Sequence, residues 1–151
     1  MKIFENLTEE ELDLLGPLFS VDNIKAKTQV IAEGDLSDAF YIIRTGHFTV
    51  NKGVNQAFIT MLGPKDYFGE ASLFHNVRRT ANVTASEECQ LLILHRNKFQ
   101  QFLLSYPMAA NRILFQMLKE LFFRLDQTSN ELQASRGSSH LAENAIHTLL
   151  R

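Results

Sequence analysis

One short stretch, residues 68–81, holds the residue types that could bind a phosphate group. Gly69 would let the backbone approach a ligand, and the residues after Glu70 could form a single helical turn, whose free N–H groups attract anions. Arg79 could pair with two phosphate oxygens, and Thr80 adds a hydroxyl donor. Glu70 would repel a phosphate, so it fits only as the acceptor of a ligand hydroxyl such as a ribose 2′-OH. A surface turn explains the same residues equally well, and their chemistry alone does not choose between the two.

Short strands are predicted around this stretch. From about residue 21 to residue 94, β-branched and aromatic runs alternate with turn signals such as Glu33-Gly34-Asp35, a pattern typical of an antiparallel sandwich, roll or barrel. Before them, Thr8 is expected to cap a short helix that has acidic residues in its first turn. The expected strands are 30–31, 40–43, 47–50, 58–62, 81–85 and 90–94.

A long helix is predicted after the strands, over residues 107–134, because Pro107 suits a first helical turn and the apolar spacing behind it is helical. Within it, apolar residues recur at alternating steps of four and three, the spacing of a two-stranded coiled coil. This spacing predicts a homodimer. The stripe could instead pack on the β unit, and one helix could do both. The predicted seam is Leu114, Leu118, Leu121, Leu125, Thr128 and Leu132.

The composition argues against several classes of protein. The chain has 151 residues, 45% of them hydrophobic, and a net charge of −2 with scattered basic residues, which does not favour nucleic acid or an anionic membrane as a partner. Neither a membrane span nor a signal peptide is visible, so we expect a cytoplasmic protein. Cys89 is the single cysteine, and the histidines form no close ligand pair, so we expect no metal and no tightly bound cofactor. No catalytic triad or carboxylate pair is visible, so we expect no enzyme.

Two motifs resemble the cyclic-nucleotide-binding domain superfamily. The phosphate-binding pattern of that superfamily is F-G-E, a short helix, then P-R followed by small or hydroxylic residues. Phe68-Gly69-Glu70 and Arg79-Thr80-Ala81 match it, and residues 68–81 are below called the cassette. Upstream, residues 34–46 resemble the superfamily's G-x-x-x-x-x-hydrophobic-Y-x-I-x-x-G. Arg78 stands where many members have proline. Two roles are open for it, a solvated surface cation and a second contact to the phosphate.

The resemblance implies a mainly β domain organisation with flanking helices. Residues 1–106 would form an N-terminal helix and a jelly-roll-like β-roll, an antiparallel double-stranded β-helix. Residues 107–134 would be the dimerisation helix, and 135–151 a hinge with the first helix fragment of an output domain. In the catabolite-activator branch of bacterial regulators, which residues 124–129 also resemble, the output domain is a winged helix. DNA would therefore be contacted only by a part that this chain lacks.

The resemblance also implies a role for each residue of the site. Backbone N–H groups of Gly69 and of Ala71 or Ser72 would bind the cyclic phosphate, Glu70 the ribose 2′-OH and Arg79 the equatorial phosphate oxygens. Thr128 of one protomer and Ser129 of the other would reach adenine from the seam. Without a bound purine, the polar Thr128 could instead fix the register of the two helices. The full expected contact set is Gly69, Glu70, Ala71, Ser72, Arg79, Thr80, Thr128, Ser129, Val50 and Thr60.

We therefore expect the allosteric sensory domain of a dimeric transcription regulator, with cAMP as its ligand and cGMP as the alternative. Two other functions stay open at this point. The same fold could sense haem or another small molecule, or it could be a dimerisation module without a ligand. The last of these would require Arg79 to be paired with a carboxylate of the protein itself.

Overall fold

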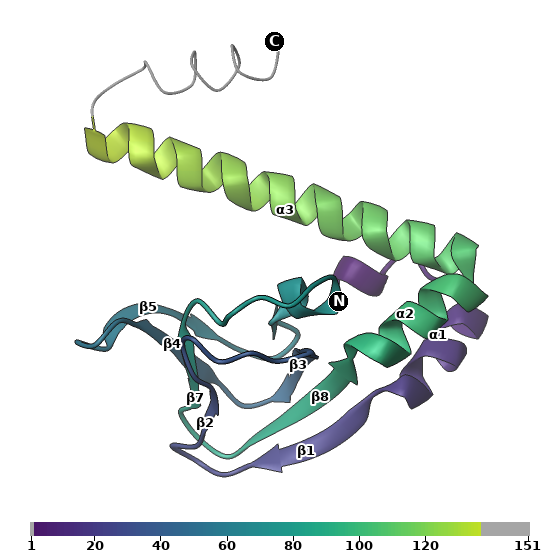
Figure 1. Cartoon of the computed structure of the whole chain (residues 1–151), viewed down its shortest axis with the longest axis horizontal. Coiled ribbons are helices and arrows are strands. Elements are labelled where there is room, and N and C mark those ends of the chain that lie inside the picture. The colour runs from purple at the N-terminus through teal and green to yellow at the C-terminus, as the bar shows by residue number, and fades with distance from the viewer. Residues whose placement is uncertain (1, 137–151) are drawn as a thin grey trace.

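The computed structural model describes residues 2–136, which form two antiparallel sheets beside a group of helices (Figure 1). The first sheet has the strand order β1-β8-β3-β6, and the second has β2-β7-β4-β5. This arrangement confirms the predicted fold class, an antiparallel β-roll followed by a long helix. The strands are β1 Ser20–Ile24, β2 Gln29–Ile31, β3 Ala39–Thr45, β4 Phe48–Lys52, β5 Ala57–Leu62, β6 Tyr67–Phe68, β7 Asn82–Ala85 and β8 Cys89–His95.

The six predicted strands are all present, and their ends differ from the prediction by at most two residues. Two further strands, β1 and β6, carry no clear pattern of their own. β1 lies at a sheet edge, where only Ile24 is buried, and it forms by pairing along its whole length with β8. β6 has two residues and pairs with Tyr41 and Ile42 of β3. Both strands therefore depend on their neighbours rather than on local alternation.

Two hydrophobic cores lie on opposite faces of the first sheet. Along β3, Phe40 and Ile42 belong to a helix core shared with the helices, whereas Tyr41 and Ile43 pack into a β core between the two sheets. This division follows from the twofold side-chain alternation of a strand. The first sheet is thus covered on both faces, which fixes the position of β6 and of the cassette that follows it.

The helices lie at one end of the sheets and along one side. They are η1 Lys2–Phe4, α1 Glu9–Leu15, η2 Gly16–Leu18, η3 Glu70–Leu73, α2 Arg96–Ser105 and α3 Pro107–Arg136. Thr8 caps α1 as predicted, because its hydroxyl accepts from the Glu11 N–H at 3.2 Å while Glu11 Oε2 accepts from the Thr8 N–H at 3.0 Å. The long helix α3 begins at Pro107, as predicted.

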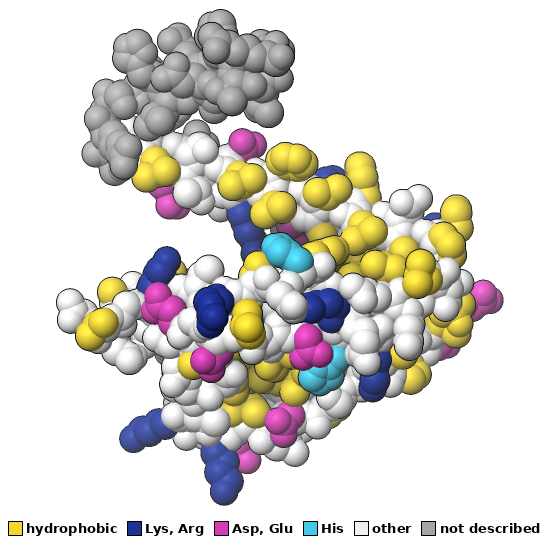
Figure 2. All heavy atoms as spheres, in the orientation of Figure 1, with side chains coloured by type: hydrophobic (Ala, Val, Ile, Leu, Met, Phe, Trp, Pro, Cys, Tyr) yellow, Lys and Arg dark blue, Asp and Glu magenta, His cyan; other side chains and the backbone are white. Residues whose placement is uncertain are grey.

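The helix α3 packs on the helix core only through its first half. Ile113 is fully buried there, and Leu114 is partly buried against the same core. Farther along, the apolar side chains turn outward, and Figure 2 shows them as yellow atoms along the helix. The exposed apolar residues are Phe115, Leu118, Leu121, Phe122, Phe123, Leu125 and Leu132, each between 45% and 63% exposed.

The described part of the chain ends within the predicted hinge. No helix among residues 2–136 combines the length and the apolar character that crossing a bilayer requires. The same residues contain no group of three His, Cys, Asp or Glu side chains that could hold a metal ion. Most of the expected hinge and the expected helix fragment, residues 137–151, lie outside the described residues.

Candidate functional site

A cavity of about 350 Å³ lies between the cassette and the β core. Its walls come from β2, β4 and β7 on one side and from the two ends of the cassette on the other. The cavity brings together six of the predicted site residues, which are Val50, Gly69, Glu70, Ala71, Arg79 and Thr80. The other lining residues are Ile31, Phe68, Val77, Arg78, Ala81 and Val83.

Gly69 links β6 to the short helix η3 in a conformation that disfavours any other residue. Its φ of 80° and ψ of 17° are left-handed. A Cβ at this position would lie 2.6 Å from Nη1 of Arg79 and 3.0 Å from the carbonyl oxygen of Ala39. The missing side chain therefore leaves room for the Arg79 guanidinium, a role that the sequence did not predict.

Arg79 is the most unusual charged group of the cavity. It is 8% exposed, and its Nη2 donates to the carbonyl of Ala39 at 2.7 Å, while Nε is buried without a partner. Its Cζ lies 5.9 Å from the centre of the Tyr41 ring. No carboxylate within residues 2–136 forms an ion pair with it, and burial lowers the pKa of Arg79. A buried cation without a counter-charge is costly, so an anion is strongly favoured beside it.

The backbone around Arg79 is held in place from a second loop. Its N–H donates to the carbonyl of Asp35 at 2.8 Å, and its own carbonyl accepts from the Gly34 N–H at 2.8 Å. The neighbouring Arg78 is exposed, but its Nη1 donates to the Gly34 carbonyl at 2.8 Å and it lines the cavity. Arg78 is therefore exposed, as expected of a surface cation, and is also anchored by this backbone contact. Its other expected role, a second phosphate contact, stays a prediction.

Glu70, at the other end of the cassette, contacts α3. Arg124 donates from Nη1 to Oε1 of Glu70 at 3.0 Å, and its Cζ lies 5.1 Å from the centre of the Tyr67 ring. The Tyr67 hydroxyl in turn donates to Glu120, and burial together with this bond raises the pKa of Tyr67. Oε2 of Glu70 makes no hydrogen bond within the described residues, so it could accept one from a ligand hydroxyl.

Arg96, the first residue of α2, holds the middle of the cassette. Its Nε donates to the Ser72 carbonyl at 2.5 Å, Nη1 to the Asn76 side chain at 2.7 Å and Nη2 to the His75 carbonyl at 3.2 Å. No sequence pattern predicts these contacts or the ion pair of Arg124 with Glu70. In both cases the two partners are far apart in the chain.

Four of the predicted site residues lie outside the cavity. Ser72 is fully buried, and its N–H donates to the Gly69 carbonyl at 3.2 Å, so of the pair Ala71 and Ser72 only Ala71 lines the cavity. Thr60 is exposed on β5. Thr128 and Ser129 are exposed on α3, where the Thr128 hydroxyl donates to the Arg124 carbonyl at 2.9 Å.

Comparison with known proteins agrees with this geometry. A family model described as "Cyclic nucleotide-binding domain" matches residues 21–106, which include both sheets and the whole cassette. The chain belongs to this family. Its β-roll is therefore a cyclic nucleotide-binding domain.

Two relatives illustrate how the domain is used. The chain is 29% identical over 140 residues to the cyclic AMP receptor protein of Thermus thermophilus, covering 89% of this chain and 65% of that protein. It is 32% identical over 101 residues to a cAMP-dependent protein kinase regulatory subunit of Yarrowia lipolytica, covering 67% of this chain and 27% of the subunit. The chain thus spans less than two-thirds of the length of either relative.

Solved structures share the fold, including the long helix. The N-terminal domain of a transcriptional regulator from Streptomyces coelicolor matches with a TM-score of 0.75 and 26% identity, over 85% of this chain and 92% of that one. The Thermus thermophilus catabolite activator protein matches with a TM-score of 0.70 and 27% identity, over 85% of this chain and 63% of that one. The fold resembles the regulatory domains of such proteins.

Proposed function

We propose that this domain binds cAMP in the cavity beneath the cassette and acts as an allosteric sensor. The proposal rests on Arg79. This side chain is 8% exposed, lines the cavity and has no carboxylate partner within residues 2–136. A cyclic phosphate carries one negative charge and two free oxygens, which suit the charge and the fork of a guanidinium.

The other cavity residues fit the remaining parts of a nucleotide. Glu70 would accept a hydrogen bond from the ribose 2′-OH through its unused Oε2, and Thr80 would add a hydroxyl near the phosphate. Backbone N–H groups of Gly69 and Ala71 would complete the phosphate contacts. Val50 gives the base an apolar wall.

Alternative functions are less well supported. A ligand-free dimerisation module would need a protein carboxylate on Arg79. The two nearby acids are instead engaged elsewhere, Glu70 by Arg124 at 3.0 Å and Asp38 by His95 at 3.1 Å. For the choice of base, the similarity over 89% of this chain to a cyclic AMP receptor protein favours cAMP over cGMP.

We further propose that two copies associate through α3 and that the chain is the sensory part of a cytoplasmic transcription regulator, without catalytic activity. The exposed apolar side chains of α3 support the dimer, since a monomeric protein rarely leaves so many apolar side chains of one helix exposed to solvent. Thr128 and Ser129 would then contact the base when α3 packs over the cavity. DNA would be bound by a domain outside this chain.

Isothermal titration with cAMP and cGMP, in buffer without phosphate, tests this function. We expect the wild-type chain to bind cAMP more tightly than cGMP, and Arg79→Ala to weaken binding at least about thirtyfold, because the phosphate loses a buried charged partner. Arg44→Ala, which removes an exposed cation of β3 outside the cavity, is the matched control and should bind as the wild type does.

The stability of each variant is checked by thermal denaturation before titration, and sedimentation velocity of the same samples tests the dimer. If neither nucleotide produces heat with the folded wild-type chain, the proposed function is wrong. Equal binding by Arg79→Ala and the wild type would mean that the ligand lies elsewhere.

A further inference from the structure

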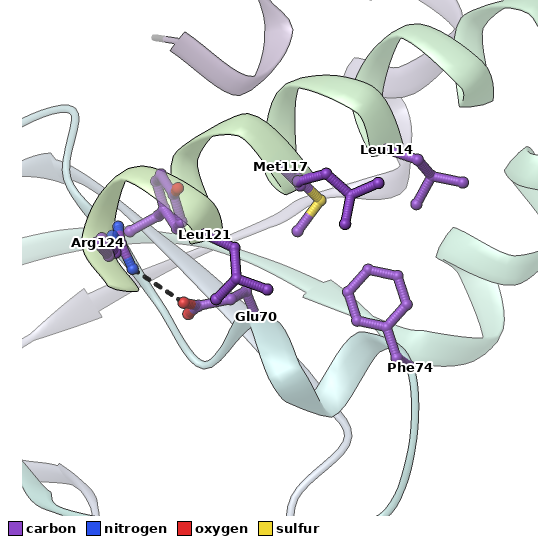
Figure 3. Close-up of a pocket in the computed structure, with 8 residues that line it drawn as sticks. Glu70, Phe74, Leu114, Met117, Leu121 and Arg124 are labelled. Atoms are coloured by element: carbon purple, nitrogen blue, oxygen red, sulfur yellow. Dashed lines mark hydrogen bonds and ion pairs between the residues drawn. The ribbon is translucent and has the colours of Figure 1, made fainter. Parts of the chain in front are cut away.

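A second cavity, of about 380 Å³, lies between the cassette and α3 (Figure 3). Leu114, Met117 and Leu121 line it from the helix, and Phe74 lines it from the middle of the cassette, where η3 ends. Figure 3 shows these side chains directed toward the same space. The volume falls in the range of about 300–1,000 Å³ that small-molecule sites occupy, and the walls are mostly apolar, as such sites usually are.

One end of this cavity is polar. Glu70 and Arg124 line it there and are joined by the ion pair that Figure 3 shows as a dashed line. Tyr67 also lines the cavity, but its hydroxyl is already engaged by Glu120. The ion pair has no net charge, and it presents a hydrogen-bond acceptor beside hydrogen-bond donors. A neutral group that both donates and accepts, such as an amide, complements it better than a carboxylate or a hydrocarbon does.

The cavity does not coincide with the outer apolar face of α3. Leu114, Met117, Leu121 and Arg124 follow helical steps of three, four and three, so they share one face of the helix. Phe115 and Phe122 belong to a different face, are each 63% exposed and do not line the cavity. A second α3 would be placed on that outer face, which leaves the inner face to another occupant.

We propose that this inner cavity binds a small, neutral, flat molecule with an aromatic body and one amide-like group. The aromatic body lies against Phe74 and Met117, and the amide lies between Glu70 and Arg124. Leu118 and Leu121, each about half exposed at 50% and 52%, border its opening to solvent. This site does not depend on the proposed nucleotide function, although Glu70 lines both cavities and would couple them.

The test uses three probes that differ only at the polar end, 2-naphthamide, 2-naphthoate and naphthalene, titrated into the full chain and followed by probe fluorescence. We expect saturable binding of one amide per chain, about tenfold tighter than for either other probe, a difference of about 1.4 kcal/mol. Met117→Trp fills the cavity and should weaken amide binding at least about tenfold. If Met117→Trp does not fold, Leu121→Trp, which lies nearer the opening, replaces it as the variant that fills the cavity.

Phe122→Trp is the matched control, since it places the same ring on the same helix but on a face outside the cavity, and it should leave the amide affinity unchanged. Arg79→Ala should also bind the amide normally, even if it no longer binds cAMP, which separates this site from the nucleotide cavity. Equal affinity for the three probes, or no effect of either filling variant, would overturn the proposal. So would loss of binding as rising chain concentration drives self-association, because a second copy would then occupy the cavity.

Discussion

The two charged ends of the cassette differ in how the protein holds them. Arg79 is 8% exposed and has no ion pair with any acid of residues 2–136, whereas the Glu70 side chain is 35% exposed and paired with Arg124 of α3. The charge at the first end is buried and uncompensated, and the charge at the second is partly exposed and neutralised. The first end is suited to select an anion, and the second can exchange its partner.

The surroundings of the two ends differ in the same way. Arg79 is fixed by bonds to the backbone of Asp35 and Ala39, which belong to the β-roll itself. Glu70 depends on a side chain from α3, a helix that contacts the roll mainly through its first half. A ligand that binds at both ends therefore links the rigid roll to the long helix, which is what an allosteric sensor requires.

The largest expected effect comes from adding one methyl group at the Arg79 end. Gly69→Ala places a Cβ 2.6 Å from Arg79 Nη1 at a φ of 80°, so it should both strain the backbone and displace the guanidinium. We expect a loss of about 2 kcal/mol or more in the free energy of unfolding, together with loss of cAMP binding. Urea denaturation and calorimetry measure the two effects separately.

Gly53→Ala is the matched control for this prediction, because its φ is 79° but nothing lies within 4 Å of the added Cβ. It should show the cost of strain alone, about 1 kcal/mol, and bind cAMP normally. If both alanine variants lose the same stability and both bind cAMP, the contact between Gly69 and Arg79 has no role in binding.

The difference between the ends also explains what could be predicted from sequence. The Arg79 end lies within one short stretch of sequence, in which a glycine, an expected helical turn and an arginine predict either a phosphate site or a surface turn. Its buried and unpaired state could not be predicted, because burial depends on Tyr41 and Ala39 of another strand. The ion pair of Glu70 with Arg124 and the contacts of Arg96 depend wholly on how α2 and α3 pack.

The same distinction applies to the fold. Six strands and the start of α3 follow from local alternation, turn residues and Pro107. β1 and β6 were missed because they form on neighbouring strands whose hydrogen bonds they satisfy. Helical spacing assigned Leu114 and Leu121 to the same seam as Leu125. It could not show that both also line a cavity against the cassette, which only the docking of α3 determines.

A second prediction concerns Glu70 and the ribose. Glu70→Gln should weaken cAMP binding about tenfold, because the acceptor of the 2′-OH loses its charge. The wild-type chain should bind 2′-deoxy-cAMP about tenfold more weakly than cAMP, whereas Glu70→Gln should barely distinguish the two nucleotides. Calorimetry of both proteins with both ligands forms a complete cycle. An undiminished preference for cAMP in the variant would assign the hydroxyl to another residue.

Tyr67 supports the Glu70 end from beneath Arg124, and its effect should depend on pH. Burial and Glu120 raise its pKa in the folded state above the ordinary value of about 10. Its contribution to the free energy of unfolding is therefore fully present below about pH 10 and falls as the pH rises further. Tyr67→Phe should cost about 1–2 kcal/mol at pH 7, and clearly less at pH 11. Urea denaturation at both pH values measures this; a constant difference would mean that the hydroxyl bond to Glu120 is not the cause.

The smallest effect is expected where the ion pair itself is removed. Arg124→Met keeps the apolar stem of the side chain but ends its pairing with Glu70, and the two side chains are 51% and 35% exposed. A pair in such contact with water contributes about 0.2–1 kcal/mol and weakens as salt is added. A double-mutant cycle with Glu70→Gln, measured by urea denaturation at low and high salt, gives the coupling energy. A coupling above about 2 kcal/mol that salt leaves unchanged would contradict the contrast between the two ends, because Glu70 would then be held as firmly as Arg79. A small and screened coupling would show instead that Arg124 can leave Glu70 at little cost, as a ligand-driven change in α3 requires.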